Sequence, residues 1–137
     1  MTTRTRPVAA RTALPQRAVL TVAGLVIVLI GGASLLAPVW FREVNGIRME
    51  AGAALLSETR AAGALLLAAG VTVLLGAFVP RLARMAAAVG AVGYLATALA
   101  RLVSLVADGS PGGGLLVAGV VELALGLACL HLLRPPR

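Results

Sequence analysis

Four long stretches of apolar residues occupy most of this 137-residue chain. A helix that crosses a bilayer needs about 20 apolar residues, because each residue adds about 1.5 Å to its length. All four stretches reach that length, so we predict an all-α integral membrane bundle of four antiparallel helices. The predicted helices span residues 18–41, 60–79, 85–107 and 114–133.

The composition supports a membrane protein and excludes several other classes. Hydrophobic residues make up 60% and charged residues 12% of the chain, against about 45–50% and about 25% in soluble domains. Four helices that are apolar on all sides would leave a soluble fold almost no polar surface. A disordered chain and an ordinary soluble enzyme domain are therefore excluded, and a single Cys excludes an internal disulfide. The partner that the composition implies is the lipid bilayer.

The net charge of +7 arises from twelve Arg residues and five acidic residues, and their distribution indicates topology. Cytoplasmic segments of membrane proteins carry an excess of basic residues. On one side of the predicted bundle lie Arg4, Arg6, Arg11, Arg17, Arg81, Arg84, Arg134 and Arg137, and on the other Arg42, Arg48 and Arg60. We therefore expect both termini in the cytoplasm and a multi-pass plasma-membrane protein. We expect no nucleic-acid partner, because nucleic-acid binding would need the basic residues to form one face of a soluble fold.

The connections define a single membrane domain over residues 18–134, between an Arg-rich N-terminal tail at 1–17 and a short tail at 135–137. Tight turns at 80–84 and 108–113 contain Pro and Gly residues that interrupt helices. Helices joined by such short turns are neighbours in a bundle.

The first helix and the connection after it leave two alternatives open. Pro38 is expected to bend the outer end of this helix, where Trp40 and Phe41 are placed as interfacial aromatic anchors. After a turn at Asn45-Gly46, residues 47–57 either extend the second helix or lie along the membrane interface. A cleaved signal peptide is an alternative for the N-terminus, but the apolar run reaches Phe41, well beyond the roughly 7–15 residues of such a segment.

Small and polar residues recur every three or four positions in the third predicted helix and therefore share one face. They are Ala86, Gly90, Gly93, Thr97, Arg101, Ser104 and Asp108. The fourth predicted helix repeats this pattern with Gly119, Glu122, Gly126 and Cys129. Small residues let helix backbones approach closely within a membrane, so Gly90, Gly93, Gly119 and Gly126 are predicted packing positions.

Arg101 and Glu122 are predicted to form an ion pair inside the membrane. Arg101 lies about 10 Å below the outer turn and Glu122 about 13 Å below it, at 1.5 Å per residue. An unpaired charge at this depth costs at least about 2.5–3.5 kcal/mol, and a pair keeps both groups ionised. The pair either fixes the helix packing alone or marks a functional site near the outer leaflet. Glu58 and Arg60 either extend this network to Asp108 or are interfacial residues.

Other constellations carry no chemistry. Cys129 and His131 are two positions apart, so they do not share a helical face. Gly112, Gly113 and Gly114 follow no strand and precede no Lys, so they predict a turn and not a phosphate loop. The hydroxyl of Tyr94 is expected to find a backbone or Thr partner. One His and one Cys build no catalytic triad, metal cluster or redox pair, so we expect no catalytic residue, metal or cofactor.

Two segments carry a family resemblance. The first is Ser-Glu-Thr-Arg-Ala-Ala-Gly at 57–63, and the second is Ala-Arg-Leu-Val-Ser-Leu-Val-Ala-Asp-Gly-Ser-Pro at 100–111, followed by Glu122. Together, over about residues 57–131, they resemble the small bacterial membrane proteins called domain of unknown function 4345. The family pattern has an acid-x-Arg-Ala start to the second helix, an Arg-x-x-Ser-x-x-x-Asp-Gly-x-Pro end to the third and a Glu in the fourth. The chain departs from it at Ala64, where a second Gly is usual.

The resemblance implies a compact four-helix bundle in the bacterial plasma membrane, and it supplies no activity. It places weight on Glu58, Arg60, Arg101, Ser104, Asp108 and Glu122. The layout is more distantly similar to small four-helix proteins of the DoxX type, which associate with redox partners, by analogy of fold alone.

Three functions remain as hypotheses. We expect first a structural or accessory membrane protein, with a membrane-protein partner or a second copy of itself. The alternative is a binder or conduit for a small anion, a proton or a lipophilic molecule such as a quinone or lipid, centred on Arg101. The third is a membrane enzyme acting on a lipid or quinone, in which Glu58 and Glu122 would have to serve as acid and base.

Overall fold

The computed structural model describes residues 9–48 and 52–134, and these residues form helices and short connections without a strand. The elements are α1 (Ala9–Leu36), α2 (Pro38–Val44), α3 (Ala53–Phe78), the 3₁₀ turn η1 (Pro80–Leu82), α4 (Ala83–Asp108) and α5 (Gly113–Leu132). Four of these helices are long and apolar enough to cross a membrane, which confirms the predicted all-α class and the predicted number of such helices. Residues 1–8 of the predicted N-terminal tail and all of the predicted C-terminal tail lie outside the described residues, whereas residues 9–17 of the N-terminal tail belong to α1.

The first helix differs from its predicted bounds at both ends, since α1 begins at Ala9 instead of residue 18 and ends before residue 41. The difference at its C-terminal end changes the course of the chain. A single helix was expected to reach residue 41, but α1 ends at Leu36 and α2 begins at Pro38. Between them Ala37 has φ −133° and ψ 58°, outside the helical region. Pro38 lacks an N–H, its ring excludes a preceding helical turn, and it restricts the residue before it. Pro38 therefore redirects the chain instead of bending a continuous helix.

The start of α3 decides part of the alternative left open for residues 47–57, of which residues 49–51 lie outside the described residues. Residues 53–57 belong to α3, so this part of the long connection extends the second membrane helix. The predicted turn at Asn45-Gly46 is present, with φ 77° at Gly46. The Asn45 side-chain amide donates a 2.7 Å hydrogen bond to the carbonyl of Phe41 and so closes the last turn of α2. The connection between α4 and α5 uses positive φ values at Gly109 and Gly112, which only glycine adopts without strain.

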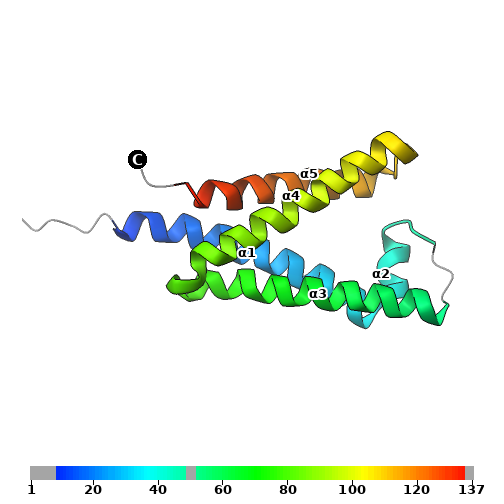
Figure 1. Ribbon diagram of the computed structural model, residues 1–137, viewed down its shortest axis with the longest axis horizontal. Coiled ribbons are helices and arrows are strands. Elements are labelled where there is room, and N and C mark those ends of the chain that lie inside the picture. The colour runs from blue at the N-terminus through cyan, green and yellow to red at the C-terminus, as the bar shows by residue number, and fades with distance from the viewer. Residues whose placement is uncertain (1–8, 49–51, 135–137) are drawn as a thin grey trace, which may run out of the picture.

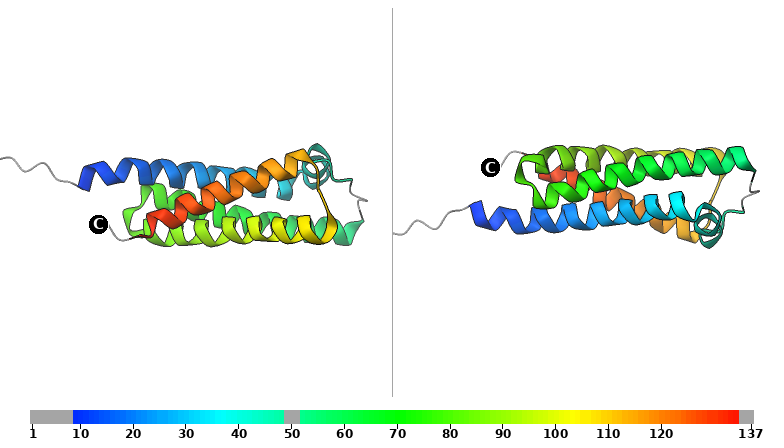
Figure 2. Two further views of the ribbon diagram at one scale, coloured as in Figure 1. Left: turned by 90° about the horizontal axis from the view of Figure 1, so that it is seen from above. Right: turned by 90° about the horizontal axis from the view of Figure 1, so that it is seen from below.

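The helices pack as two pairs. In one pair α1 runs along α3, in the other α4 lies beside α5, and α3 and α4 join the pairs through η1 (Figure 1). Seen from above and below, the four long helices lie roughly along one direction (Figure 2). Large aliphatic side chains are exposed on all of them, including Leu29, Leu65, Val106 and Val117. Exposed aliphatic side chains on every long helix are what a lipid-facing surface requires.

Glycines bring the backbones of α1 and α3 into direct contact. A Cβ atom at Gly24 would lie 2.7 Å from the amide nitrogen of Leu74, and one at Gly70 would lie 2.7 Å from that of Val28. Gly63 is equally close to α1, where its Cβ would lie 2.7 Å from the nitrogen of Leu35. Small residues at such contacts allow close van der Waals packing, which drives helix association in lipid, where the hydrophobic effect between helices is absent.

The closest packing between the two pairs lies in the half of the bundle that contains η1. The buried core there includes Leu20, Val73, Ala86 and Cys129. In the same region the buried hydroxyl of Tyr94 on α4 donates a 2.7 Å hydrogen bond to the carbonyl of Ala23 on α1, as expected for an intramembrane Tyr. Toward the end where α2 lies, α4 and α5 diverge from α1 and α3 (Figure 1).

Candidate ligand-binding cavity

Arg101 on α4 and Glu122 on α5 form a two-point ion pair. Arg101 Nε donates to Glu122 Oε2 at 2.6 Å, and Arg101 Nη2 donates to Glu122 Oε1 at 2.8 Å. Glu122 is nearly enclosed, with 10% of its side chain exposed, whereas 36% of the Arg101 side chain is exposed. The predicted pairing of these two residues is therefore confirmed. Two parallel hydrogen bonds between opposite charges fix the orientation of the guanidinium as well as its position.

Three of the four glycines predicted as packing positions have close neighbours. A Cβ at Gly119 would lie 3.3 Å from Arg101 Cδ, so the missing side chain gives the Arg101 stem room to lie against α5. A Cβ at Gly126 would lie 2.8 Å from Leu95 Cδ2, and one at Gly90 would lie 2.9 Å from the sulfur of Cys129. Gly93 differs, because no atom lies within 4 Å of the position its Cβ would take.

The polar residues nearer the loops before α3 and after α4 are not connected to the ion pair. Ser104 Oγ donates a 2.8 Å hydrogen bond to Asp108 Oδ2, one turn further along the same helix. Glu58 and Arg60 are exposed on α3, and within the described part of the chain neither has an ion-pair partner. The buried residue of this segment is Thr59, whose hydroxyl donates to the carbonyl of Leu55. The extended network considered from the sequence is thus divided into separate local contacts.

A partly enclosed cavity of about 460 Å³ lies beside the ion pair. All five α-helices contribute to its walls, which are mainly apolar and include Ile27, Ile30, Leu66, Val89 and Leu115. The polar side chains of its lining are Ser34, Arg42, Asn45, Tyr94, Thr97, Arg101 and Glu122. The short helix α2 and the residues that follow it close the cavity at one end.

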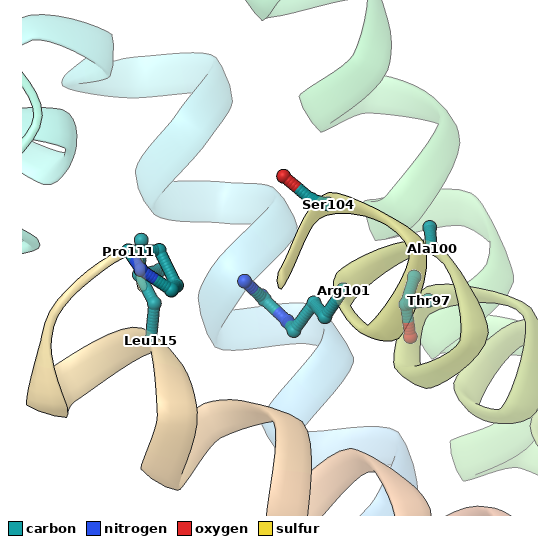
Figure 3. Close-up of a pocket in the computed structure, with 6 residues that line it drawn as sticks. All are labelled: Thr97, Ala100, Arg101, Ser104, Pro111 and Leu115. Atoms are coloured by element: carbon teal, nitrogen blue, oxygen red, sulfur yellow. The ribbon is translucent and has the colours of Figure 1, made fainter. Parts of the chain in front are cut away.

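A second, shallower hollow of about 330 Å³ adjoins this cavity. It is lined by Thr97, Ala100, Arg101, Ser104, Pro111 and Leu115, and we call it the outer groove. Figure 3 shows the Arg101 side chain reaching from α4 toward the side on which Pro111 and Leu115 lie. Thr97, Arg101 and Leu115 line both hollows, so these residues form the wall between the cavity and the outer groove.

The sequence analysis treated Arg42 only as a topology signal, yet this residue lines the cavity. Its Nε atom is buried and has no hydrogen-bond partner among residues 9–48 and 52–134. The signal that points to this position is Pro38 at the end of an apolar helix, because it forces the following residues to fold back over the bundle.

The remaining candidate residues lie in different parts of the described structure. Glu58 lines neither of the two hollows, so it is not placed with Glu122 as an acid–base pair. Cys129 is buried, and His131 is exposed. In the portion of the chain that is described, no three His, Cys, Asp or Glu side chains are grouped as metal ligands would be.

Four apolar helices of spanning length around an internal ion pair and cavity are the features of a multi-pass membrane protein. The chain matches the family model described as Domain of unknown function (DUF4345) over residues 15–133, and it belongs to that family. The match includes the first membrane helix, which lies outside the segments that carried the resemblance. No curated protein and no solved structure matches the chain.

Proposed function

We propose that this protein is a bacterial plasma-membrane protein that binds a small lipophilic molecule in the cavity between its two helix pairs. The observation that carries the proposal is the cavity of about 460 Å³ next to the Arg101–Glu122 pair. Pockets for small molecules are typically about 300–1,000 Å³, with apolar walls and a few fixed polar groups. The apolar lining and the ion pair in this cavity match that description.

The topology that accompanies this proposal is an antiparallel bundle with both termini in the cytoplasm. Gly24 faces Leu74, whereas Gly63, earlier in α3, faces Leu35, later in α1, and this opposite order supports the antiparallel arrangement. The excess of Arg residues beside the termini and around η1 supports the cytoplasmic side for that end. The cavity would then lie toward the outer leaflet.

A purely structural role for the ion pair accounts less well for its surroundings. Protein interiors are close-packed, and a pair that only fixed helix register would need no open space beside it. The Arg101 side chain keeps one-third of its surface exposed, toward the cavity and the outer groove. Nη1 of Arg101 donates no hydrogen bond within the described residues, so part of the guanidinium is available to a ligand.

Tryptophan fluorescence tests the proposal directly, because Trp40 is the single Trp of the chain. Trp40 is 59% exposed, whereas the adjacent Phe41 lines the cavity. The double variant Trp40→Phe/Phe41→Trp therefore moves the reporter into the cavity wall. In lipid nanodiscs, brominated dodecanol should quench Trp at position 41 in a saturable way, and unlabelled dodecanol should reverse the quenching. Quenching of Trp40 in the wild-type chain should instead rise in proportion to the brominated alcohol in the bilayer.

Two glycine substitutions in the reporter background separate cavity binding from general partitioning. Gly93 lines the cavity, and a Cβ added there would meet no atom within 4 Å. Gly93→Leu therefore places a side chain in the cavity and should abolish saturable quenching. Gly32→Leu also starts in open space but does not line the cavity, and should leave quenching unchanged. Non-saturable quenching at position 41, or equal effects of the two substitutions, would refute the proposal.

A further inference from the structure

The charged side chains that line the cavity do not balance. Its wall contains two guanidinium groups, Arg42 and Arg101, and one carboxylate, Glu122. Both oxygens of Glu122 accept hydrogen bonds from Arg101, so this carboxylate is already engaged. The other acids that the structure describes on these helices, including Glu43 and Asp108, do not line the cavity. Among residues 9–48 and 52–134, the lining therefore carries one positive charge in excess.

Hydrogen-bond donors are also in excess within the cavity. The amide of Asn45 and the hydroxyl of Tyr94 donate to backbone carbonyls of Phe41 and Ala23. The hydroxyl of Thr97 donates to carbonyls of its own helix. The buried Nε of Arg42, by contrast, lacks a partner among the described residues. A buried donor without an acceptor is costly, and a charged one more so, which creates a demand for an anionic acceptor.

The two arginines approach the cavity from different parts of the fold. Arg101 projects from α4 and is held by Glu122, while Arg42 projects from α2, the short helix that Pro38 redirects across the end of the bundle. The same wall contains Ile27, Ile30 and Leu66, which offer only apolar contacts. The cavity thus offers both cationic and apolar contacts, as a molecule with a charged head and an alkyl chain would require.

We propose that the ligand of this cavity is an anionic single-chain amphiphile, with a carboxylate or phosphate head held by Arg42 and Arg101. This inference rests on the proposed function, because it specifies the chemical class of the lipophilic molecule. Guanidinium groups bind carboxylate and phosphate oxygens through paired, charge-assisted hydrogen bonds, so both head groups satisfy the same donors. The alkyl chain contacts the apolar side chains of the lining, and the two arginines disfavour amphiphiles with a positive head.

The test uses the full chain with Trp at position 41 in nanodiscs of neutral phosphatidylcholine, at a pH that keeps the carboxylic acid probe ionised. Dodecanoate, dodecyl phosphate, dodecanol and dodecylamine are compared as competitors of brominated dodecanol. We expect dodecanoate, dodecyl phosphate or both to compete at concentrations about tenfold lower than dodecanol, and dodecylamine to compete more weakly than dodecanol. The ratio of dodecanoate to dodecyl phosphate identifies the preferred head group. Inorganic phosphate, which lacks a chain, should not compete at concentrations at which dodecyl phosphate does.

Arg42→Gln should reduce the preference for the anions over dodecanol to less than about threefold. Arg48→Gln is the matched control, because Arg48 is exposed on the connection and does not line the cavity, and it should keep the full preference.

Equal competition by dodecanoate, dodecyl phosphate and dodecanol in the unsubstituted reporter protein overturns this inference while the proposed function stands. Competition by inorganic phosphate as strong as that of dodecyl phosphate, or an undiminished preference in Arg42→Gln, also overturns it. Absence of any saturable quenching by brominated dodecanol refutes the proposed function itself.

Discussion

The Arg101–Glu122 pair is expected to respond asymmetrically when either partner is replaced. The variants are Arg101→Met, Glu122→Leu and the double variant, which removes both charges and keeps similar side-chain volumes. Removing one partner of a buried pair typically costs about 3–5 kcal/mol, because the other charge is left without compensation. Replacing both partners by apolar residues is often close to neutral.

The exposures of the two side chains set the size of each effect. After Arg101→Met, the Glu122 carboxylate remains in a site where 10% of its side chain is exposed, so we expect a loss of about 2–4 kcal/mol. After Glu122→Leu, Arg101 is already 36% exposed and can turn toward the outer groove. We therefore expect a smaller loss of about 1–2 kcal/mol, close to that of hydrogen bonds between helices in membranes. The double variant should lie within about 1 kcal/mol of the wild-type protein.

The measurement is reversible unfolding in mixed micelles of a mild detergent and dodecyl sulfate, followed by circular dichroism. A double-mutant cycle isolates the interaction between the two side chains, and about 2 kcal/mol or more of coupling is expected. Additive single effects below about 0.5 kcal/mol would refute the argument that each charge depends on the other. The double variant also connects stability to function. If it folds and loses saturable quenching of Trp at position 41, the pair serves the cavity as well as the bundle.

Two further predictions concern contacts that hold the bundle together. Gly31→Ala should destabilise the protein by about 1–3 kcal/mol, because the added Cβ would overlap the backbone of Leu67. Gly32→Ala should instead stabilise the protein by up to about 1 kcal/mol, because its Cβ meets no atom within 4 Å and Ala favours the helix over Gly. The same unfolding assay measures both, and effects of the same sign would contradict the packing of α1 on α3. Tyr94→Phe removes the hydroxyl that donates to Ala23 and should cost about 1 kcal/mol. The substitution should also loosen the contact between the helix pairs, which hydrogen exchange would detect as lower amide protection on α1 and α4. Unchanged protection on both of these helices would argue against a role of the Tyr94 hydroxyl in joining the pairs.

Several features of this protein could be predicted from the sequence because they depend on local pattern. The four membrane helices follow from the length of the apolar runs, and the breaks between them follow from Pro and Gly residues. The pairing of Arg101 with Glu122 follows from their similar depth below one tight turn, together with the cost of an unpaired charge in lipid. The hydrogen bond made by the Tyr94 hydroxyl follows from the need of a buried donor for a partner.

The contacts between helices that are distant in the sequence were harder to predict. Gly63 and Gly70 contact the backbone of α1, but their spacing alone does not say which helix lies opposite. Glu58, Arg60 and Asp108 were expected at the same end of the membrane helices as the ion pair, yet the structure does not join them to it. Similar depth brings residues together only when their faces point toward each other, and the rotation of each helix is set by packing along its whole length.

The sequence by itself determined the number of spans, the internal ion pair and the family to which the chain belongs, because hydrophobicity, helical periodicity and short motifs are properties of neighbouring residues. Only the tertiary structure decided that the two helix pairs diverge, that α2 closes the space between them, and that Arg42 lines it beside Arg101. The physical reason is that a cavity is defined by the crossing of helices and the direction of a connection. Both depend on side chains far apart in the chain, and a single Pro at position 38 determines where the connection turns.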